Sequence, residues 1–198
     1  LSETYKDMYD EKGRRFSNRI KANIEIMSDR IHEILQVVKI GMVKYDFKDN
    51  VSEEIVNNVL ITLEDKIESN NIKILIKHNL PTVLCDENRM RDVFYNLVNN
   101  AIKFMGDDKQ RQITIGCDKD GDYYKFFVED SGIGIRKEYQ EQVFRIFKRL
   151  KDVESEGTGV GLAIAKKIIE IHKGKLWIES PIARGKGSRF CFTIPMNS

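Results

Sequence analysis

RDVFYNLVNNAIKFM, residues 91–105, predicts an amphipathic helix whose polar face is rich in asparagine. At 100° per residue its apolar side comprises Met90, Phe94, Leu97, Val98 and Ala101. Its polar side comprises Asp92, Asn96, Asn99, Asn100 and Lys103. Asparagine is a poor helix former, and Asn96 and Asn100 are one turn apart, so both amides point into the same space. This pair indicates a binding face, although two asparagines at this spacing also occur by chance on solvent-exposed helices.

A long helix is expected before this stretch. Apolar residues recur there in steps of three and four: Phe16, Ile20, Ile24, Met27, Ile31, Leu35, Val38, Met42 and Tyr45. Such a narrow stripe is typical of a helix that packs along a seam. Because helices in globular domains average only about 11–12 residues, we predict packing in a dimeric bundle rather than a single helix lying on its own domain.

The remaining elements do not follow the regular alternation of a doubly wound sheet. Residues 47–51 read as a linker, and Ser52 is expected to cap a helix over 53–69, with Glu53 and Glu54 in its first turn. Asp86 is expected to cap the asparagine-rich helix. Further helices are expected at 137–144 and 160–172, and strands at 72–77, 82–85, 111–119, 122–129, 175–179 and 188–194, with a tight turn at Asp120–Gly121. The order predicts an α+β sandwich, a mixed sheet with helices on one face.

Composition excludes several classes of protein. The chain has 198 residues and 41% hydrophobic residues, enough for one sizeable core and a smaller unit. Its net charge of +2, from 33 basic and 31 acidic side chains, gives no strong attraction to nucleic acid or to a membrane surface. Three distant cysteines without metal-ligand spacing favour a reducing, cytoplasmic location. No apolar run could span a bilayer. The first residue, Leu1, suggests a piece of a longer protein, which could itself be membrane-anchored.

Two glycine motifs carry the chemistry. DSGIGI, residues 130–135, directly follows a predicted strand, and its glycines allow close backbone approach. The Asp130 carboxylate can accept hydrogen bonds from an exocyclic amine such as that of adenine, although Asp-Ser-Gly is also ordinary turn chemistry. EGTGVGL, residues 156–162, leads into a helix, so its backbone N–H groups and the helix N-terminus suit phosphates. Neither motif matches the phosphate loop or the dinucleotide fingerprint. A third cluster, residues 185–187, is expected to be structural.

Together these motifs resemble the Bergerat ATP-binding fold of the gyrase, chaperone, histidine kinase and MutL superfamily. Within it the chain is similar to the sensor histidine kinases over residues 14–195. NLVNNAIKF (96–104) resembles the asparagine box and DSGIGI the first glycine box. VFRIFKRL (143–150) resembles the phenylalanine box, and GTGVGLAIAKKI (157–168) the second glycine box. The sequence of residues 147–180 further resembles the phytochrome-like branch of the sensor histidine kinases.

The resemblance implies a role for each matching residue. Asn100 would be the Mg²⁺ ligand, Asn96 would help to hold metal and phosphate, and Lys103 would reach toward the phosphates. Asp130 would recognise the adenine amine. The purine would be bordered by Phe104 or Ile135, and its wall shaped by Gly132 and Gly134.

Residues 148–159 would form a lid over the triphosphate, with Arg149 as a charge partner of the γ-phosphate. The second glycine box would contact phosphate through Gly157, Thr158, Gly159, Val160, Gly161 and Leu162. By the same resemblance, residues 1–46 would be part of a dimerisation and phosphotransfer hairpin, and residues 52–198 the catalytic domain. The γ-phosphate of ATP would pass to a histidine on a dimerisation helix and then to an aspartate of a response-regulator receiver domain.

Asn96 also bears on the type of reaction. The hydrolysing branches of the superfamily carry a Glu at the matching position as general base, and an amide cannot accept that proton. Transfer to a histidine is therefore favoured over the alternative, an ATP-gated conformational ATPase of the gyrase or MutL type. A degenerate interaction module without nucleotide is a further alternative.

A histidine kinase needs an acceptor histidine, and the chain contains His32, His78 and His172. His32 precedes Glu33, a dipeptide often found at the acceptor, but it lies on what resembles the second helix of the hairpin and no proline follows it. We therefore expect the acceptor to lie outside this chain, which would not phosphorylate itself and would dimerise weakly. His78, in a turn, and His172, at a helix end where a cation would suit the dipole, are expected to be structural.

Overall fold

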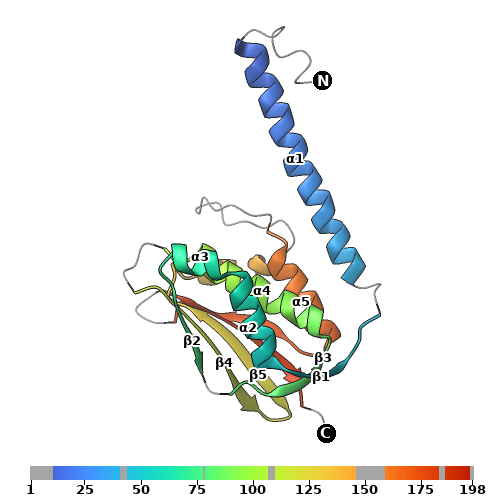
Figure 1. Cartoon of the computed structure of the whole chain (residues 1–198), viewed down its shortest axis with the longest axis vertical. Helices are drawn as coiled ribbons and strands as arrows, with labels where there is room; N and C mark the ends of the chain where they lie inside the picture. Colours follow the sequence, from blue (N-terminus) through green and yellow to red (C-terminus); the bar gives the residue numbers. More distant parts are fainter. Residues whose placement is uncertain are drawn as a thin grey trace.

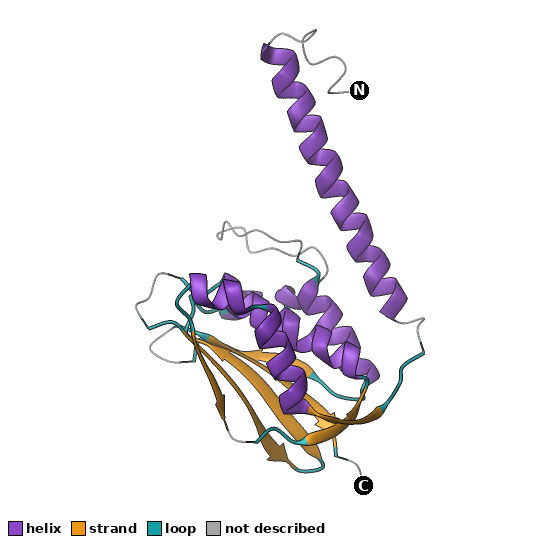
Figure 2. Ribbon diagram, viewed as in Figure 1, coloured by secondary structure: helices purple, strands orange, loops and turns teal. Residues whose placement is uncertain are grey.

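The computed structural model describes residues 11–40, 44–77, 79–106, 110–145, 159–182 and 186–196. Within these ranges helices cover one face of a mixed sheet, and a long helix projects away from this body (Figures 1 and 2). The α-helices are α1 Glu11–Ile40, α2 Ser52–Thr62, α3 Glu64–Ser69, α4 Glu87–Lys103 and α5 Gly161–Ile171. The strands are β1 Lys48–Val51, β2 Lys73–Lys77, β3 Thr82–Cys85, β4 Gln112–Asp120, β5 Tyr123–Asp130, β6 Leu176–Glu179 and β7 Ser188–Pro195. The predicted α+β sandwich is confirmed.

The main sheet has the strand order β2-β4-β5-β7-β6. Strand β2 pairs with β4 in parallel, whereas the other pairs are antiparallel. Strands β4 and β5 form the predicted hairpin, in which Asp120 pairs with Tyr123 and Gly121 takes a φ of 58°, as a tight turn requires. This register brings Asp130, the last residue of β5, opposite Ser188, the first residue of β7.

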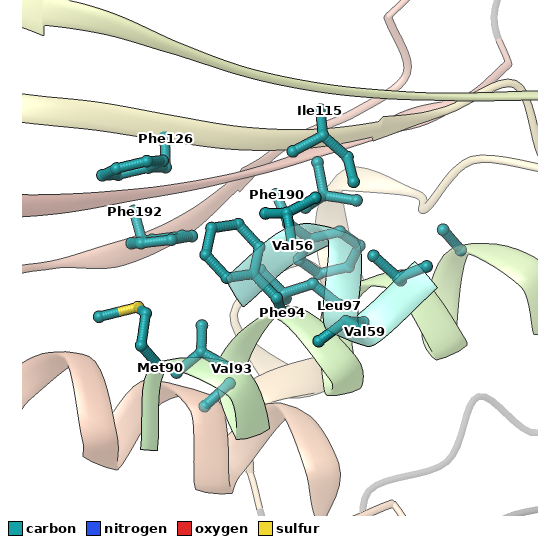
Figure 3. Close-up of a cluster of buried hydrophobic side chains, with 14 of the residues drawn as sticks. Val56, Val59, Met90, Val93, Phe94, Leu97, Ile115, Phe126, Phe190 and Phe192 are labelled. Atoms are coloured by element: carbon teal, nitrogen blue, oxygen red, sulfur yellow. The ribbon is translucent and has the colours of Figure 1, made fainter. Parts of the chain in front are cut away.

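The apolar face of α4 fills the centre of the sandwich, as predicted. Met90, Phe94, Leu97, Val98 and Ala101 are each at most 1% exposed. The Phe94 ring meets the rings of Phe126 and Phe192 edge-on, with centroids 5.9 and 5.4 Å away (Figure 3). Full burial of a side chain as large as Val, Leu, Met or Phe stabilises the fold by about 1.5–3 kcal/mol. This packing turns the asparagine face of α4 away from the core.

Four local expectations were wrong. The supposed linker contains strand β1, which pairs with β3 in a separate two-stranded ribbon. Ser52 does not cap α2: it is the first residue of the helix, and its buried hydroxyl has no hydrogen-bond partner among the described residues. The helix expected over 53–69 is divided at Leu63, and 137–144 forms two 3₁₀ turns, η1 Lys137–Tyr139 and η2 Gln142–Phe144. Asp86, in contrast, caps α4 by accepting a hydrogen bond from the Arg89 N–H at 3.0 Å.

The predicted seam included Met42, which lies outside the described residues, and Tyr45, which lies in the irregular segment before β1 rather than in α1, described as Glu11–Ile40. Tyr45 and Phe47 pack against the His172 ring, with centroids 5.8 and 4.8 Å from it. Asp86 joins the same junction, because its carboxylate accepts a hydrogen bond from the Asp46 N–H at 2.9 Å. These contacts fix the chain between α1 and the sandwich.

His172 is structural, as expected, but it is not a cation. The ring accepts a hydrogen bond from the Asp86 N–H at Nε2 (3.1 Å), which leaves Nδ1–H to donate to the Ile168 carbonyl (2.8 Å). Burial lowers the pKa of His172 below its ordinary value. The neutral ring thus uses both nitrogens within the fold. Its link to Asp86 joins the end of α5 to the start of α4.

Helix α1 keeps an exposed apolar stripe. Its exposed fractions are 54% for Phe16, 59% for Ile20, 60% for Ile24, 64% for Met27 and 48% for Leu35. Within the described ranges, no helix combines the length and apolar character that crossing a membrane requires.

Candidate functional site

Asp130 ends strand β5 with a buried carboxylate. The side chain is 6% exposed, and Oδ1 accepts a hydrogen bond from the Gly132 N–H at 2.9 Å. Burial raises the pKa of Asp130 to about 6, against the opposing effect of hydrogen bonds from the backbone of Gly132 and Ser188. At neutral pH the site therefore holds a carboxylate with acceptor capacity beyond the Gly132 bond, in a place shielded from water. A ligand that donates a hydrogen bond here would offset part of the cost of burial.

The loop after Asp130 is fastened to the end of α4. The Ile133 N–H donates to the Phe104 carbonyl at 3.1 Å. A Cβ on Gly132 would lie 2.2 Å from that carbonyl oxygen and 2.8 Å from Asp130 Oδ1, so only glycine fits. The asparagine box and the first glycine box are thus brought together. Ile135 and Phe104, the predicted purine neighbours, are both half-buried beside this contact.

Asn96 lies against the start of α5. Its Nδ2 donates to the Asp92 carbonyl one turn earlier at 2.8 Å. A Cβ on Gly161, the first residue of α5, would lie only 2.3 Å from Asn96 Oδ1. The second glycine box and the asparagine box therefore meet at this point, through residues 65 positions apart in the sequence.

The N-terminus of α5 can receive an anion. Val160 precedes the helix and makes no side-chain cap hydrogen bond to it. The first backbone N–H groups of an α-helix have no intrahelical acceptor, so they can donate to a bound anion. Gly159, with a φ of 78°, leads into this turn, and Leu162 follows within it. Asn100 is half-buried one turn after Asn96 on the same face of α4.

Lys103 lies at the last turn of α4, where its Nζ is 5.3 Å from the centroid of the Phe104 ring. An ammonium over an aromatic face is attracted by the ring, so this contact holds Lys103 beside Phe104, a predicted neighbour of the purine. Gly134, with a φ of 75°, shapes the far side of the Asp130 loop. Arg149, Gly157 and Thr158 fall outside the described residues.

No metal cluster of the carboxylate or histidine type is present in the described part of the chain. The amide oxygens of Asn96 and Asn100 are nevertheless suitable donors for Mg²⁺, which takes oxygen ligands and keeps several waters or substrate oxygens. A metal held mainly by a nucleotide's phosphates, with an amide oxygen from the protein, fits these residues.

Ser180, Gln140 and Ser188 were not singled out from the sequence, yet they contact the Asp130 loop. The Ser180 hydroxyl accepts a hydrogen bond from the Ile135 N–H at 2.7 Å, and Gln140 Nε2 donates to the Ile135 carbonyl at 3.3 Å. The only available signal was the glycine cluster at 185–187, which marks a close backbone approach but not its partner.

These features define a nucleotide-binding sandwich of the gyrase and histidine kinase type. A family model described as "Histidine kinase-, DNA gyrase B-, and HSP90-like ATPase" matches residues 85–198. The chain belongs to this family, and within it the chain holds the ATP-binding catalytic domain of a sensor histidine kinase.

One related protein and two solved structures of another support this placement. Cyanobacterial phytochrome B of Nostoc sp. (strain PCC 7120 / SAG 25.82 / UTEX 2576) is 39% identical over 197 residues, 98% of this chain and 26% of that protein. The catalytic domain of histidine kinase ThkA is 33% identical, with a TM-score of 0.65 over 76% of this chain and 95% of that one. ThkA in complex with response regulator protein TrrA is 28% identical, with a TM-score of 0.71 over 98% of this chain and 55% of that one. The chain spans about a quarter of the length of the phytochromes it matches.

Proposed function

We propose that this chain binds Mg-ATP and supplies the catalytic region of a protein-histidine kinase, transferring the γ-phosphate to a histidine on a dimerisation helix. The observation that carries the proposal is the meeting of three separate motifs. The Phe104 carbonyl accepts a hydrogen bond from the Ile133 N–H, and Asn96 lies against Gly161, so base-recognition and phosphate-recognition groups lie along the second half of α4. Residues 52–198 are the catalytic domain in this proposal.

The base is recognised at Asp130. Its carboxylate accepts a hydrogen bond from the exocyclic amine of adenine, beside the bond that Oδ1 already accepts from Gly132. Phe104 and Ile135 border the purine. Gly132 and Gly134 let the backbone of the loop come close to the ring.

The phosphates are held at the start of α5 and on the asparagine face of α4. Backbone N–H groups of the second glycine box bind phosphate oxygens, with Lys103 and Arg149 supplying positive charge. Asn100 ligates Mg²⁺, and Asn96 helps to hold metal and phosphate. When bound, the metal neutralises charge on the phosphates. The residues of the box assigned to this role are Gly157, Thr158, Gly159, Val160, Gly161 and Leu162.

Transfer rather than hydrolysis follows from Asn96, whose amide cannot act as a base toward water. An imidazole carries its own nucleophilic nitrogen and needs no such base. His172 is not the acceptor, because both of its nitrogens are hydrogen-bonded inside the fold. We assign the acceptor to a dimerisation helix outside this chain. The ThkA relative forms a complex with a response regulator, and we assign a receiver domain as the partner of this protein too.

A transfer assay tests this function against that of a gyrase-like ATPase. The chain is mixed with labelled Mg-ATP and a separate dimerisation hairpin that carries an acceptor histidine. We expect acid-labile label on the hairpin, none on this chain, and phosphate release no faster than with the Asp130→Asn variant. Steady phosphate release without transfer would instead favour the ATPase.

We also propose that residues 1–46 contribute to a dimerisation hairpin through the exposed stripe of α1. Ile24→Lys is expected to abolish self-association, because a charge would be buried in the seam. Sedimentation should show the wild-type chain associating only above low micromolar concentration, and Ile24→Lys remaining monomeric. The matched control is Asn23→Lys, which adds the same charge at an exposed position beside the stripe. A wild-type dimer at low micromolar concentration would contradict weak association, and equal effects of the two variants would contradict the seam.

A further inference from the structure

The loop that follows Asp130 is held not only by α4 but also by the connection between β6 and β7. The Gly187 N–H donates to the Gly132 carbonyl at 2.8 Å. A Cβ on Gly187 would lie 2.6 Å from the Asp130 carbonyl oxygen, so the two segments are in direct backbone contact. This contact places Gly187 directly against the loop that forms the wall that we assign to adenine.

Ser180, directly after β6, is the side chain at the centre of this contact. Its hydroxyl accepts a hydrogen bond from the Ile135 N–H at 2.7 Å and donates one to the Gly187 carbonyl at 2.9 Å. The Ser188 hydroxyl lies 3.2 Å away. Since Ser180 has only one proton to donate, Ser188 must be the donor in that third contact. The hydroxyl of Ser180 therefore uses its single donor and both of its acceptor sites.

Two further contacts leave the loop little freedom to move. Gln140 Nε2 donates both to the Ile135 carbonyl and to the Ser180 carbonyl, which bridges the same two residues a second time. A Cβ on Gly134 would lie 3.4 Å from Ser180 Oγ and 3.2 Å from the Gly187 oxygen. Ile135 is thus held at its N–H by Ser180 and at its carbonyl by Gln140.

We propose that Ser180 is a positioning residue for the base: its hydroxyl fixes the Ile135 backbone, and through it the wall that adenine contacts, without itself binding nucleotide. This inference rests on the proposed function, because it assumes that adenine lies between Asp130 and Ile135. Removing the hydroxyl leaves a backbone N–H and a carbonyl without their partner, and the loop gains alternative positions.

Ser180→Ala tests the proposal, with Thr193→Val as its matched control. Thr193 Oγ1 accepts a hydrogen bond from the Lys175 N–H at 3.0 Å, so it makes the same kind of contact at the other end of the β6–β7 pair. We expect Ser180→Ala to weaken binding of a non-hydrolysable ATP analogue about tenfold, the loss of one well-made hydrogen bond. Thr193→Val should lower thermal stability about as much as Ser180→Ala does. Its affinity for the ATP analogue should nevertheless stay within about twofold of wild type. Ser180→Thr, which keeps the hydroxyl, should restore most of the affinity.

Amide hydrogen exchange supplies a readout that does not depend on nucleotide. Ser180→Ala should speed exchange of the Ile135 amide while the amides of β5 stay protected. If the wild-type chain binds the analogue and Ser180→Ala binds it equally well, the positioning role is wrong while the proposed function stands. It is also wrong if Thr193→Val weakens binding as much as Ser180→Ala. If the wild-type chain binds no analogue, the proposed function fails and the role of Ser180 fails with it.

Discussion

Asp130→Asn is expected to weaken binding of an ATP analogue by at least about 100-fold while the domain remains folded. The carboxylate has two acceptor oxygens, and Oδ1 is already engaged by the Gly132 N–H. An amide has one oxygen, so it can serve either Gly132 or the adenine amine. The NH₂ group of the amide would then face the other hydrogen-bond donor, either the Gly132 N–H or the adenine amine, in a buried site. Losing a charge-assisted hydrogen bond and leaving a buried donor unpaired together account for a loss of this size.

The same substitution should not lower stability at neutral pH. Burial raises the pKa of Asp130 from 3.8 to about 6, so the folded protein binds this proton more tightly than the unfolded chain does. The resulting contribution to the free energy of unfolding, about 3 kcal/mol, is fully present below about pH 4 and is lost as the pH rises through about 6. At pH 7.5 the wild-type protein therefore carries a buried charge that Asp130→Asn lacks.

Thermal unfolding from pH 4.5 to pH 8 measures this effect. Asp130→Asn should unfold at the same or a higher temperature than wild type at pH 7.5, and its advantage should vanish below about pH 5. The matched control for binding is Glu129→Gln, which changes the preceding carboxylate, on the opposite face of β5, where it pairs with Arg189. Nucleotide affinity that survives Asp130→Asn, or that Glu129→Gln reduces equally, would refute the assignment of the base.

Gly161→Ala is expected to weaken the phosphate site with little change in stability. The added Cβ would lie 2.3 Å from Asn96 Oδ1 and 3.2 Å from Asn96 Cγ, so the amide must swing away and break its bond to the Asp92 carbonyl. Alanine is a better helix former than glycine by up to about 1 kcal/mol, which offsets part of that loss. We expect the affinity for the Mg-bound ATP analogue to fall about 10–100-fold, since Asn96 and the start of α5 are displaced together.

A double-mutant cycle with Asn96→Ala shows whether the effect passes through Asn96. Asn96→Ala removes the atoms that the new Cβ would meet, so Gly161→Ala should cause little further loss of affinity in that background. Additive losses would mean that Gly161 acts on phosphate by another route. Gly132→Ala provides the contrast, because its Cβ would meet the backbone oxygen of Phe104 at 2.2 Å and should destabilise the fold itself.

The sequence predicted those elements whose signals are local. The face of α4 follows from a helical period kept over 17 residues and from a capping aspartate at its start. The β4–β5 hairpin follows from alternation on both sides of Asp120–Gly121, although the two residues of the turn are Gly121 and Asp122. Two contacts of the site join residues of the motifs found in the sequence. Asp130 binds Gly132 within the first glycine box, and Asn96 of the asparagine box lies against the start of α5 in the second glycine box.

Contacts between residues far apart in the sequence could not be predicted in this way, because no local sequence pattern marks them. Strand β1 has four residues and a mostly exposed pattern, and its partner β3 lies more than 30 positions further on. Ser52 resembled a helix cap, but Val51 takes that position and the Ser52 N–H donates to the Pro81 carbonyl instead. Ser180 contacts Ile135 across 45 positions, and a single serine after a strand predicts no such partner.

The most direct test of the account is an equilibrium titration of the wild-type chain with non-hydrolysable analogues of ATP and GTP, with Mg²⁺ at pH 7.5. Guanine carries a carbonyl oxygen where adenine carries its amine, so it would place an acceptor against the Asp130 carboxylate. We predict saturable binding of the ATP analogue and at least about 100-fold weaker binding of the GTP analogue. Equal affinity for both analogues, or no saturation with the ATP analogue, would contradict adenine recognition at Asp130.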